Sequence, residues 1–86
     1  MEGRMDLTPV ERHILVHLLL EGDDVPGNIG DDDPDSDRPH TASVSRSMKN
    51  LEKKGLVRHK GSAVYRLTNQ GLTAARNVRN STGSGS

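Results

Sequence analysis

The densest apolar segment of the chain, residues 10–20, decides what kind of core this sequence can build. Its apolar side chains recur at helical spacing but cover more than one face of the helix. Ahead of it, Thr8 can cap the helix, Pro9 suits the first helical position and Glu11 completes a capping box. Gly22 then ends the helix. Such a helix either occupies the centre of the fold or meets a partner subunit with its outer side.

The remaining composition allows only a thin core. The chain has 86 residues, enough for one small domain, and 30% of them are apolar, against ~45–50% in a typical domain. Tyr65 is the one aromatic residue, so Leu, Val and Ile must fill the core. The absence of cysteine excludes disulfide frameworks, thiolate zinc sites and cysteine nucleophiles. No apolar run approaches the ~20 residues of a membrane span, and no signal-peptide pattern is present. We therefore expect a cytoplasmic protein with no membrane contact.

Charge is divided sharply between the two halves of the chain. Residues 1–37 hold 11 acidic and two basic residues, a net charge of −9. Residues 38–86 hold ten basic residues and the single acid Glu52, a net charge of +9. A half-chain this basic favours a polyanionic partner such as nucleic acid, although an internal dipole that merely aids folding and solubility would give the same numbers.

The acidic half ends in a short helix and a loop. We expect the helix at residues 24–30, capped by Asp24 and with Pro26 in its first turn. Residues 31–39 are acidic, contain two prolines and are typical of a loop. A third helix is expected from its cap Thr41 to about residue 54, followed by Gly55.

The basic half continues with a hairpin and a last helix. Residues 56–60 and 63–67 are two short β-prone runs around a turn with Gly61 and Ser62. Alternation turns Tyr65 and Leu67 inward and Arg66 outward. Thr68 should cap the final helix. We expect one domain at residues 7–79, with flexible termini at residues 1–6 and 80–86.

Three segments together resemble the winged helix-turn-helix transcriptional regulators of archaea. They read LTPVER at residues 7–12, VSRSMKNLEKKGLV at residues 44–57 and VYRLTNQG at residues 64–71. The chain is most similar to the short, haloarchaeal, phage-repressor-like branch, over about residues 7–79. The resemblance implies an α+β fold with a three-helix core, a two-stranded hairpin wing and a C-terminal helix. One departure is the long, acidic connection at residues 31–40, where the family has only a few residues.

By this resemblance, the helix at residues 41–54 is a recognition helix that enters the major groove of DNA. Val44, Met48 and Leu51 lie on one side of the helix and should face the core. Basic and amide side chains lie opposite, where Arg can pair with guanine, Asn with adenine, and Lys and Ser with phosphates. An ordinary solvated face is the alternative. The candidate DNA contacts of this helix and the residues before it are Arg38, His40, Thr41, Ser43, Ser45, Arg46, Lys49, Asn50 and Lys53.

The hairpin at residues 57–67 would be the wing. Its candidate DNA contacts are Arg58, Lys60, Ser62 and Arg66, which cluster around the turn and could reach the phosphate backbone or a narrow minor groove. The alternative is an edge hairpin whose charges block strand-to-strand aggregation.

Other site patterns in the sequence fail on spacing. The alternating aspartates at residues 31–37 lack the glycine and glutamate that a calcium loop needs at its sixth and twelfth positions, and are typical of a solvated acidic loop in a high-salt cytoplasm. His13 and His17 have the spacing of a metal pair but no adjacent Glu and no third ligand. We find no phosphate-cradling loop and no nucleophile elbow. The protein is therefore expected to be neither an enzyme nor a holder of metals or cofactors.

The sequence thus predicts a halophilic, sequence-specific regulator of transcription that binds double-stranded DNA. Without room for an effector domain, it would act as a repressor by occupying its operator. A homodimer on a palindromic site is expected. The apolar residues available for its contact are Leu15, Leu19 and Leu20 of the first helix and Leu72 and Val78 of the last. The alternative function is a winged helix used for protein–protein contact without DNA binding.

Overall fold

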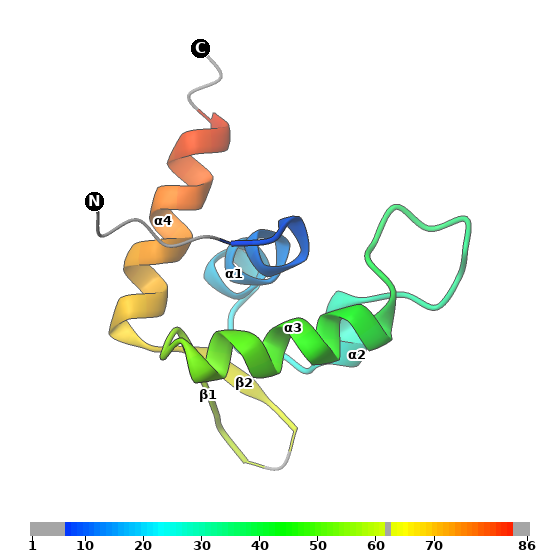
Figure 1. The fold of residues 1–86 in the computed structure, drawn as a ribbon, viewed down its shortest axis with the longest axis horizontal. Coiled ribbons are helices and arrows are strands. Elements are labelled where there is room, and N and C mark those ends of the chain that lie inside the picture. Colours follow the sequence, from blue (N-terminus) through cyan, green and yellow to red (C-terminus); the bar gives the residue numbers. More distant parts are fainter. Residues whose placement is uncertain (1–6, 62, 84–86) are drawn as a thin grey trace.

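The computed structural model describes residues 7–61 and 63–83, which form an α+β fold of four helices and one antiparallel hairpin (Figure 1). The elements in chain order are α1 (Pro9–Glu21), α2 (Pro26–Ile29), α3 (Thr41–Lys53), β1 (Val57–His59), β2 (Tyr65–Leu67) and α4 (Asn69–Gly83). This order and the α+β class agree with the prediction. No helix in the described part of the chain has the length and apolar character that crossing a membrane requires.

Helix α1 occupies the centre of the fold, where it packs against α3, α4 and β2. Ile14, Leu15 and Leu18 are buried along it, which explains why its apolar residues exceed a single face. Leu15 is 0% exposed, so the prediction that it contributes to a subunit contact is wrong. Leu20 is 54% exposed and remains available for such a contact.

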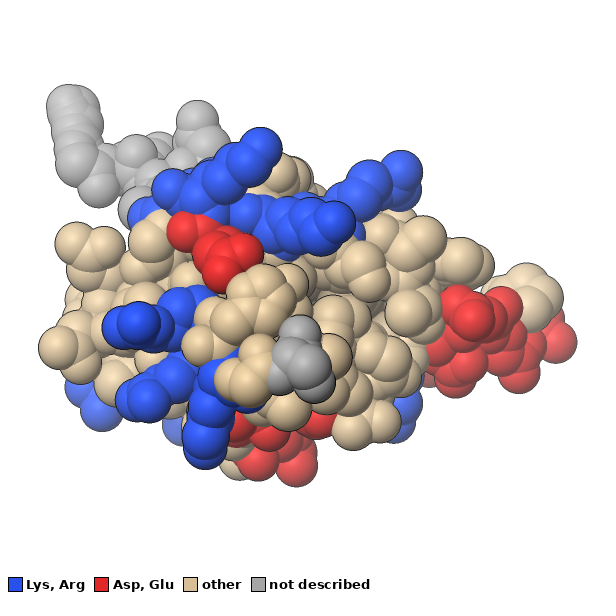
Figure 2. Space-filling view, turned by 90° about the horizontal axis from the view of Figure 1, so that it is seen from below, with Lys and Arg blue, Asp and Glu red and all other residues tan. Residues whose placement is uncertain are grey.

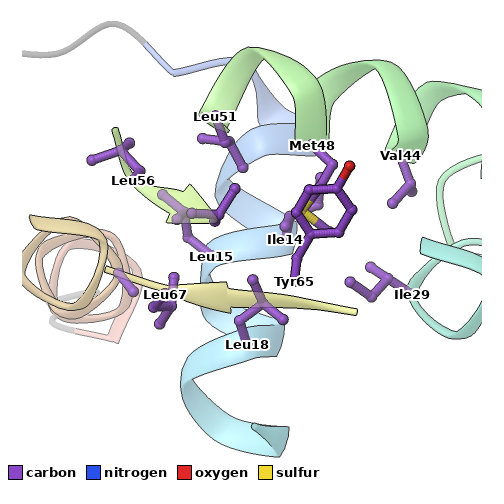
Figure 3. Close-up of a cluster of buried hydrophobic side chains, with 12 residues drawn as sticks. Ile14, Leu15, Leu18, Ile29, Val44, Met48, Leu51, Leu56, Tyr65 and Leu67 are labelled. Carbon is purple, nitrogen blue, oxygen red and sulfur yellow. The ribbon is translucent and has the colours of Figure 1, made fainter. Parts of the chain in front are cut away.

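The core lies between α1, α3 and the hairpin (Figure 3). Val44, Met48 and Leu51 enter it from α3, as their spacing predicted. Tyr65 and Leu67 are buried and Arg66 is exposed, so the period-two prediction for β2 is also confirmed. Aliphatic side chains make up nearly all of the rest. The other buried members are Ile14, Leu15, Leu18, Ile29, Leu56, Val57 and Ala75.

A buried carboxylate connects the start of α1 to the end of α3. Glu11 is 1% exposed and completes the predicted capping box by accepting a hydrogen bond from the Thr8 N–H at 2.9 Å. Its two carboxylate oxygens lie 3.0 and 3.1 Å from Lys54 Nζ. The negative charge of Glu11 is therefore compensated by the Thr8 N–H and by the ammonium group of Lys54 at the end of α3.

Two predicted helix caps are wrong. Val25, not Asp24, precedes α2, because the Asp24 backbone is instead paired with Tyr65 in an isolated bridge. Thr41 is the first residue of α3, and His40 is the cap: its backbone is extended, and its Nδ1 accepts a hydrogen bond from the Ala42 N–H at 3.2 Å. Both predictions followed the usual ranking of capping side chains, which tertiary pairing and an accepting imidazole nitrogen override here.

The start of α4 is joined tightly to the turn between α3 and β1. As predicted, Thr68 caps α4, since its Oγ1 accepts from the Gly71 N–H at 3.0 Å. The same hydroxyl donates to the Gly55 carbonyl at 2.6 Å, and the Thr68 N–H donates to the Leu56 carbonyl at 3.0 Å. Gly55 has a φ of +80°, which favours glycine at this turn. Helix α4 continues to Gly83 and so extends past residue 79, where the predicted domain ended.

Substituting Gly71 by alanine should destabilise the protein strongly. A Cβ at this position would overlap the carbonyl oxygen of Leu56, and backbone cannot move aside as a flexible side chain can. We expect Gly71→Ala to lower the free energy of unfolding by about 2–3 kcal/mol, measured by urea denaturation followed by circular dichroism. Gly27→Ala is the control, because a Cβ there has no neighbour within 4 Å. An equal decrease in the free energy of unfolding in the two variants would contradict the close contact between Gly71 and the Leu56 backbone.

Candidate nucleic-acid interface

Helix α3 presents a polar, positively charged face to solvent. With Val44, Met48 and Leu51 buried, the opposite side exposes Ala42, Arg46, Lys49, Asn50 and Lys53. Thr41, Ser43 and Ser45 lie at its margins and are partly exposed. Within residues 7–61 and 63–83, the side chains of Arg46, Lys49 and Lys53 make no hydrogen bond or ion pair. These cations are therefore available to a partner.

The hairpin adds a second group of cations. Arg58 of β1 and Arg66 of β2 are register partners, and both are exposed. Lys60 differs, because its Nζ forms an ion pair with Asp23 Oδ2 at 3.0 Å. The predicted contact Ser62 lies outside the described residues.

The two groups of cations are separate on the face of the molecule that Figure 2 shows. Lys and Arg side chains lie along its upper edge and at its lower left, with Asp or Glu side chains between the two groups and at the lower edge, whereas the Asp side chains of the loop between α2 and α3 protrude at the right. Glu52, the single acid of the basic half-chain, lies in the last turns of α3. Its Oε2 is 2.8 Å from His59 Nδ1, and the His59 ring packs on Tyr65 with ring centroids 4.2 Å apart. This contact links α3 to the hairpin.

The acid Glu52 also affects the buried tyrosine. Burial of the Tyr65 side chain raises the pKa of its hydroxyl above the ordinary value, and the negative charge of Glu52 adds to this effect. The hydroxyl of Tyr65 therefore remains a neutral group between the two basic elements at physiological pH.

Arg38 and His40 lie apart from the hairpin cations, at the beginning of α3. The Arg38 guanidinium donates to the Asn28 carbonyl at 3.4 Å, and His40 Nε2 is 3.6 Å from Asp32 Oδ1. Helix α3 has 13 residues and is therefore about 20 Å long. These two predicted contacts thus stand beside the acidic loop, while Lys53 stands beside the hairpin.

The acidic loop has a defined local structure. Its ends are joined by a hydrogen bond from the Asp31 N–H to the Pro39 carbonyl at 2.9 Å. Asp31 and Asp33 each accept a hydrogen bond from the N–H two residues later, at 3.0 Å. The pKa of Asp31 is held below its ordinary value mainly by the hydrogen bond from the Asp33 N–H, and further by the Ser36 hydroxyl. Among the described residues, no three His, Cys, Asp or Glu side chains converge in a way that could hold a metal ion.

His17 and Asp24 connect α1 to the segment before α2. His17 Nε2 lies 2.8 Å from Asp24 Oδ2, while Asp24 Oδ1 accepts from Asn28 Nδ2 and the Val25 N–H. Burial would raise the pKa of Asp24, but these hydrogen bonds outweigh it and hold the pKa below the ordinary value. Burial lowers the pKa of His13, and the nearby charges of His17 and Arg38 lower it further. His17 is thus bound to Asp24, whereas no such carboxylate partner is found for His13 among the described residues.

Sequence reasoning missed a depression of about 420 Å³ between the base of the hairpin and the start of α4. Arg58 and Arg66, both predicted contacts, lie on its wall. Asn69 and Gln70 also contribute and carried no signal in the sequence, because the depression exists only where the hairpin meets α4. The complete lining is Gly55, Arg58, Arg66, Leu67, Thr68, Asn69, Gln70 and Leu72.

Known proteins give no independent indication of what this interface binds. Comparisons with models of protein families, with curated proteins and with solved structures found no match.

Acid should reveal the contribution of Asp24 to stability. Because the folded-state pKa of this carboxyl lies below its unfolded value, its contribution is present above about pH 4 and is lost as the pH falls through the folded-state pKa. We expect Asp24→Asn to be less stable than the natural protein at pH 6 by about 1 kcal/mol, and the difference to shrink towards pH 2. Denaturation curves across this range measure it.

Asp37→Asn is the matched control, since the exposed Asp37 side chain makes no hydrogen bond among the described residues. It should follow the curve of the natural protein throughout. A constant gap between Asp24→Asn and the natural protein from pH 6 to pH 2 would contradict the role given to the charged carboxylate.

Proposed function

We propose that this protein is a winged-helix regulator of transcription that binds double-stranded DNA in a sequence-specific manner and represses by occupying its operator. One observation carries the proposal: Arg46, Lys49 and Lys53 form an outward face on α3 without any ion pair in the described part of the chain. A solvated helix face usually mixes charges of both signs, whereas this one holds Glu52 alone at its flank.

The chemistry of this face suits base recognition. Arg46 can form two parallel hydrogen bonds with guanine, and Asn50 can do the same with adenine. Lys49, Lys53 and the partly exposed Ser43 and Ser45 can hold phosphates on either side of the groove. The small side chain of Ala42 lets the first turn of the helix approach the base edges closely. Because Val44, Met48 and Leu51 fix the opposite side in the core, binding would need little rearrangement of α3.

The hairpin acts as the wing in this proposal. Arg58 and Arg66 point away from the core and are free to meet the phosphate backbone. Lys60 has a structural role as well, because its ion pair with Asp23 ties the hairpin to the segment between α1 and α2. Two copies would bind a palindromic operator, with the exposed Leu20 and the partly buried Leu19, Leu72 and Val78 as the apolar surface available to a dimer contact.

A winged helix that recognises only another protein is the alternative, and the salt dependence of DNA binding separates the two. Each phosphate contact contributes about −0.9 to the slope of log affinity against log salt concentration. If three to five of the free cations meet phosphates, the slope should lie between about −3 and −5. Fluorescence anisotropy with a labelled duplex measures it. Absence of binding to any duplex from a random-sequence selection at low salt would overturn the proposal.

Arg46→Ala tests base recognition directly. We expect it to weaken binding to the selected site by about 1–3 kcal/mol and to relax the preference at one base pair. The control is Arg76→Ala, which removes an exposed arginine of α4 outside the interface and should leave selectivity unchanged. A loss of only a few tenths of a kcal/mol with Arg46→Ala, equal to that of the control, would show that Arg46 does not read a base.

The acidic loop should restrict how DNA approaches. It lies at the far end of α3 from the hairpin, so its charge repels a duplex placed against that end. Replacing Asp32, Asp33, Asp35 and Asp37 with asparagine should raise affinity for random DNA several-fold at low salt, and less at high salt. Unchanged affinity for random duplexes at low salt would contradict this role.

A further inference from the structure

We infer that the depression between the base of the hairpin and the start of α4 is a phosphate-binding site, built around the guanidinium groups of Arg58 and Arg66. The inference has a second part, which rests on the proposed function: in the DNA complex, the bound phosphate is one phosphodiester group of the DNA backbone. The site is distinct from the base-reading face of α3 and would add affinity without sequence preference.

The pairing of two arginines across the hairpin is the first reason. Arg58 and Arg66 are register partners on adjacent antiparallel strands, so their side chains leave the sheet on the same face. Like charges placed directly opposite each other destabilise a strand pair. Neither guanidinium has a hydrogen bond or ion pair in residues 7–61 and 63–83. An anion held between the two groups would convert this repulsion into two attractive contacts.

The lining of the depression is the second reason. Arg58, Arg66, Asn69 and Gln70 line it, and no acidic residue does. Guanidinium groups present paired N–H donors whose spacing matches two oxygens of a phosphate. The depression has a volume of about 420 Å³ and is open to solvent, so a phosphate that belongs to a continuous strand can enter it.

The third reason is that the two walls are held in place without a ligand. Thr68 connects them, because its hydroxyl donates to the Gly55 carbonyl and its N–H donates to the Leu56 carbonyl. Gly71 in the first turns of α4 packs so closely on the Leu56 backbone that a Cβ there would overlap the Leu56 carbonyl, which holds α4 against the turn. A site that is formed in advance loses less free energy to ordering when the ligand binds.

Inorganic phosphate tests the pocket by itself. In two-dimensional NMR spectra of the full chain, millimolar phosphate should shift the Nε–H signals of Arg58 and Arg66 and the backbone amides of Asn69 and Gln70, with saturation. The double variant Arg58→Gln/Arg66→Gln should lose these shifts, whereas Arg76→Gln/Arg79→Gln, which removes two exposed arginines of α4, should keep them. Equal shifts in both variants would overturn the phosphate site. Circular dichroism confirms that each variant is folded.

Binding to DNA tests the phosphodiester part. Arg58→Gln/Arg66→Gln should make the salt slope shallower by about 1 to 2, and should weaken selected and random duplexes by the same factor. The control double variant should change the slope by less than half of that. If the natural protein binds duplexes and both variants give one slope, the phosphodiester assignment fails and the proposed function stands. If phosphate shifts the pocket signals but no duplex binds, the phosphodiester assignment and the proposed function fail, and the site holds free phosphate.

Discussion

The buried carboxylate of Glu11 is the interaction on which the geometry of this small fold depends. Taking a charge out of water is costly unless a cation and further hydrogen bonds compensate it, and Lys54 and the Thr8 N–H supply both. Because Glu11 stands in the first turn of α1 and Lys54 directly follows α3, the pair fixes how these two helices cross. Together with the burial of Val44, Met48 and Leu51, this crossing leaves Arg46 and Lys49 on the outer side of α3.

The turn after Lys54 fixes the position of the hairpin relative to α3. Gly55 turns the chain into the hairpin, and Thr68 is bonded to the same turn from the end of β2, so the hairpin leaves the end of α3 at a fixed angle. The contact between Glu52 and His59 adds a second connection between α3 and β1. Hydrogen bonds at their base thus hold the two basic elements, α3 and the hairpin, next to each other. Repulsion among the cations alone would favour the opposite arrangement.

Local signals explain which parts of the fold were predictable. The capping box at Thr8 and Glu11, the i, i+4, i+7 spacing of Val44, Met48 and Leu51, and the alternation of Tyr65 and Leu67 each involve neighbours in sequence, and the structure confirms all three. The cap of α2, the burial of Leu15 and the ion pairs of Lys54 and Lys60 depend on contacts between distant segments. The sequence therefore placed Lys60 in one class with Arg46 as a candidate DNA contact, whereas in the structure Lys60 is paired with Asp23 and Arg46 has no ion pair among the described residues. The depression beside α4 also forms between segments that are distant in sequence, so no local pattern predicts it.

The exposed side of α3 has one further consequence. Among residues 7–61 and 63–83, the side chains of Arg46, Lys49, Asn50 and Lys53 make no hydrogen bond or ion pair. Substitutions at Ala42, Arg46, Lys49 or Lys53 should therefore change the stability of the fold little. If this face recognises DNA as proposed, its residues could vary between related proteins without loss of the fold, and the domain would suit libraries in which these four positions are randomised.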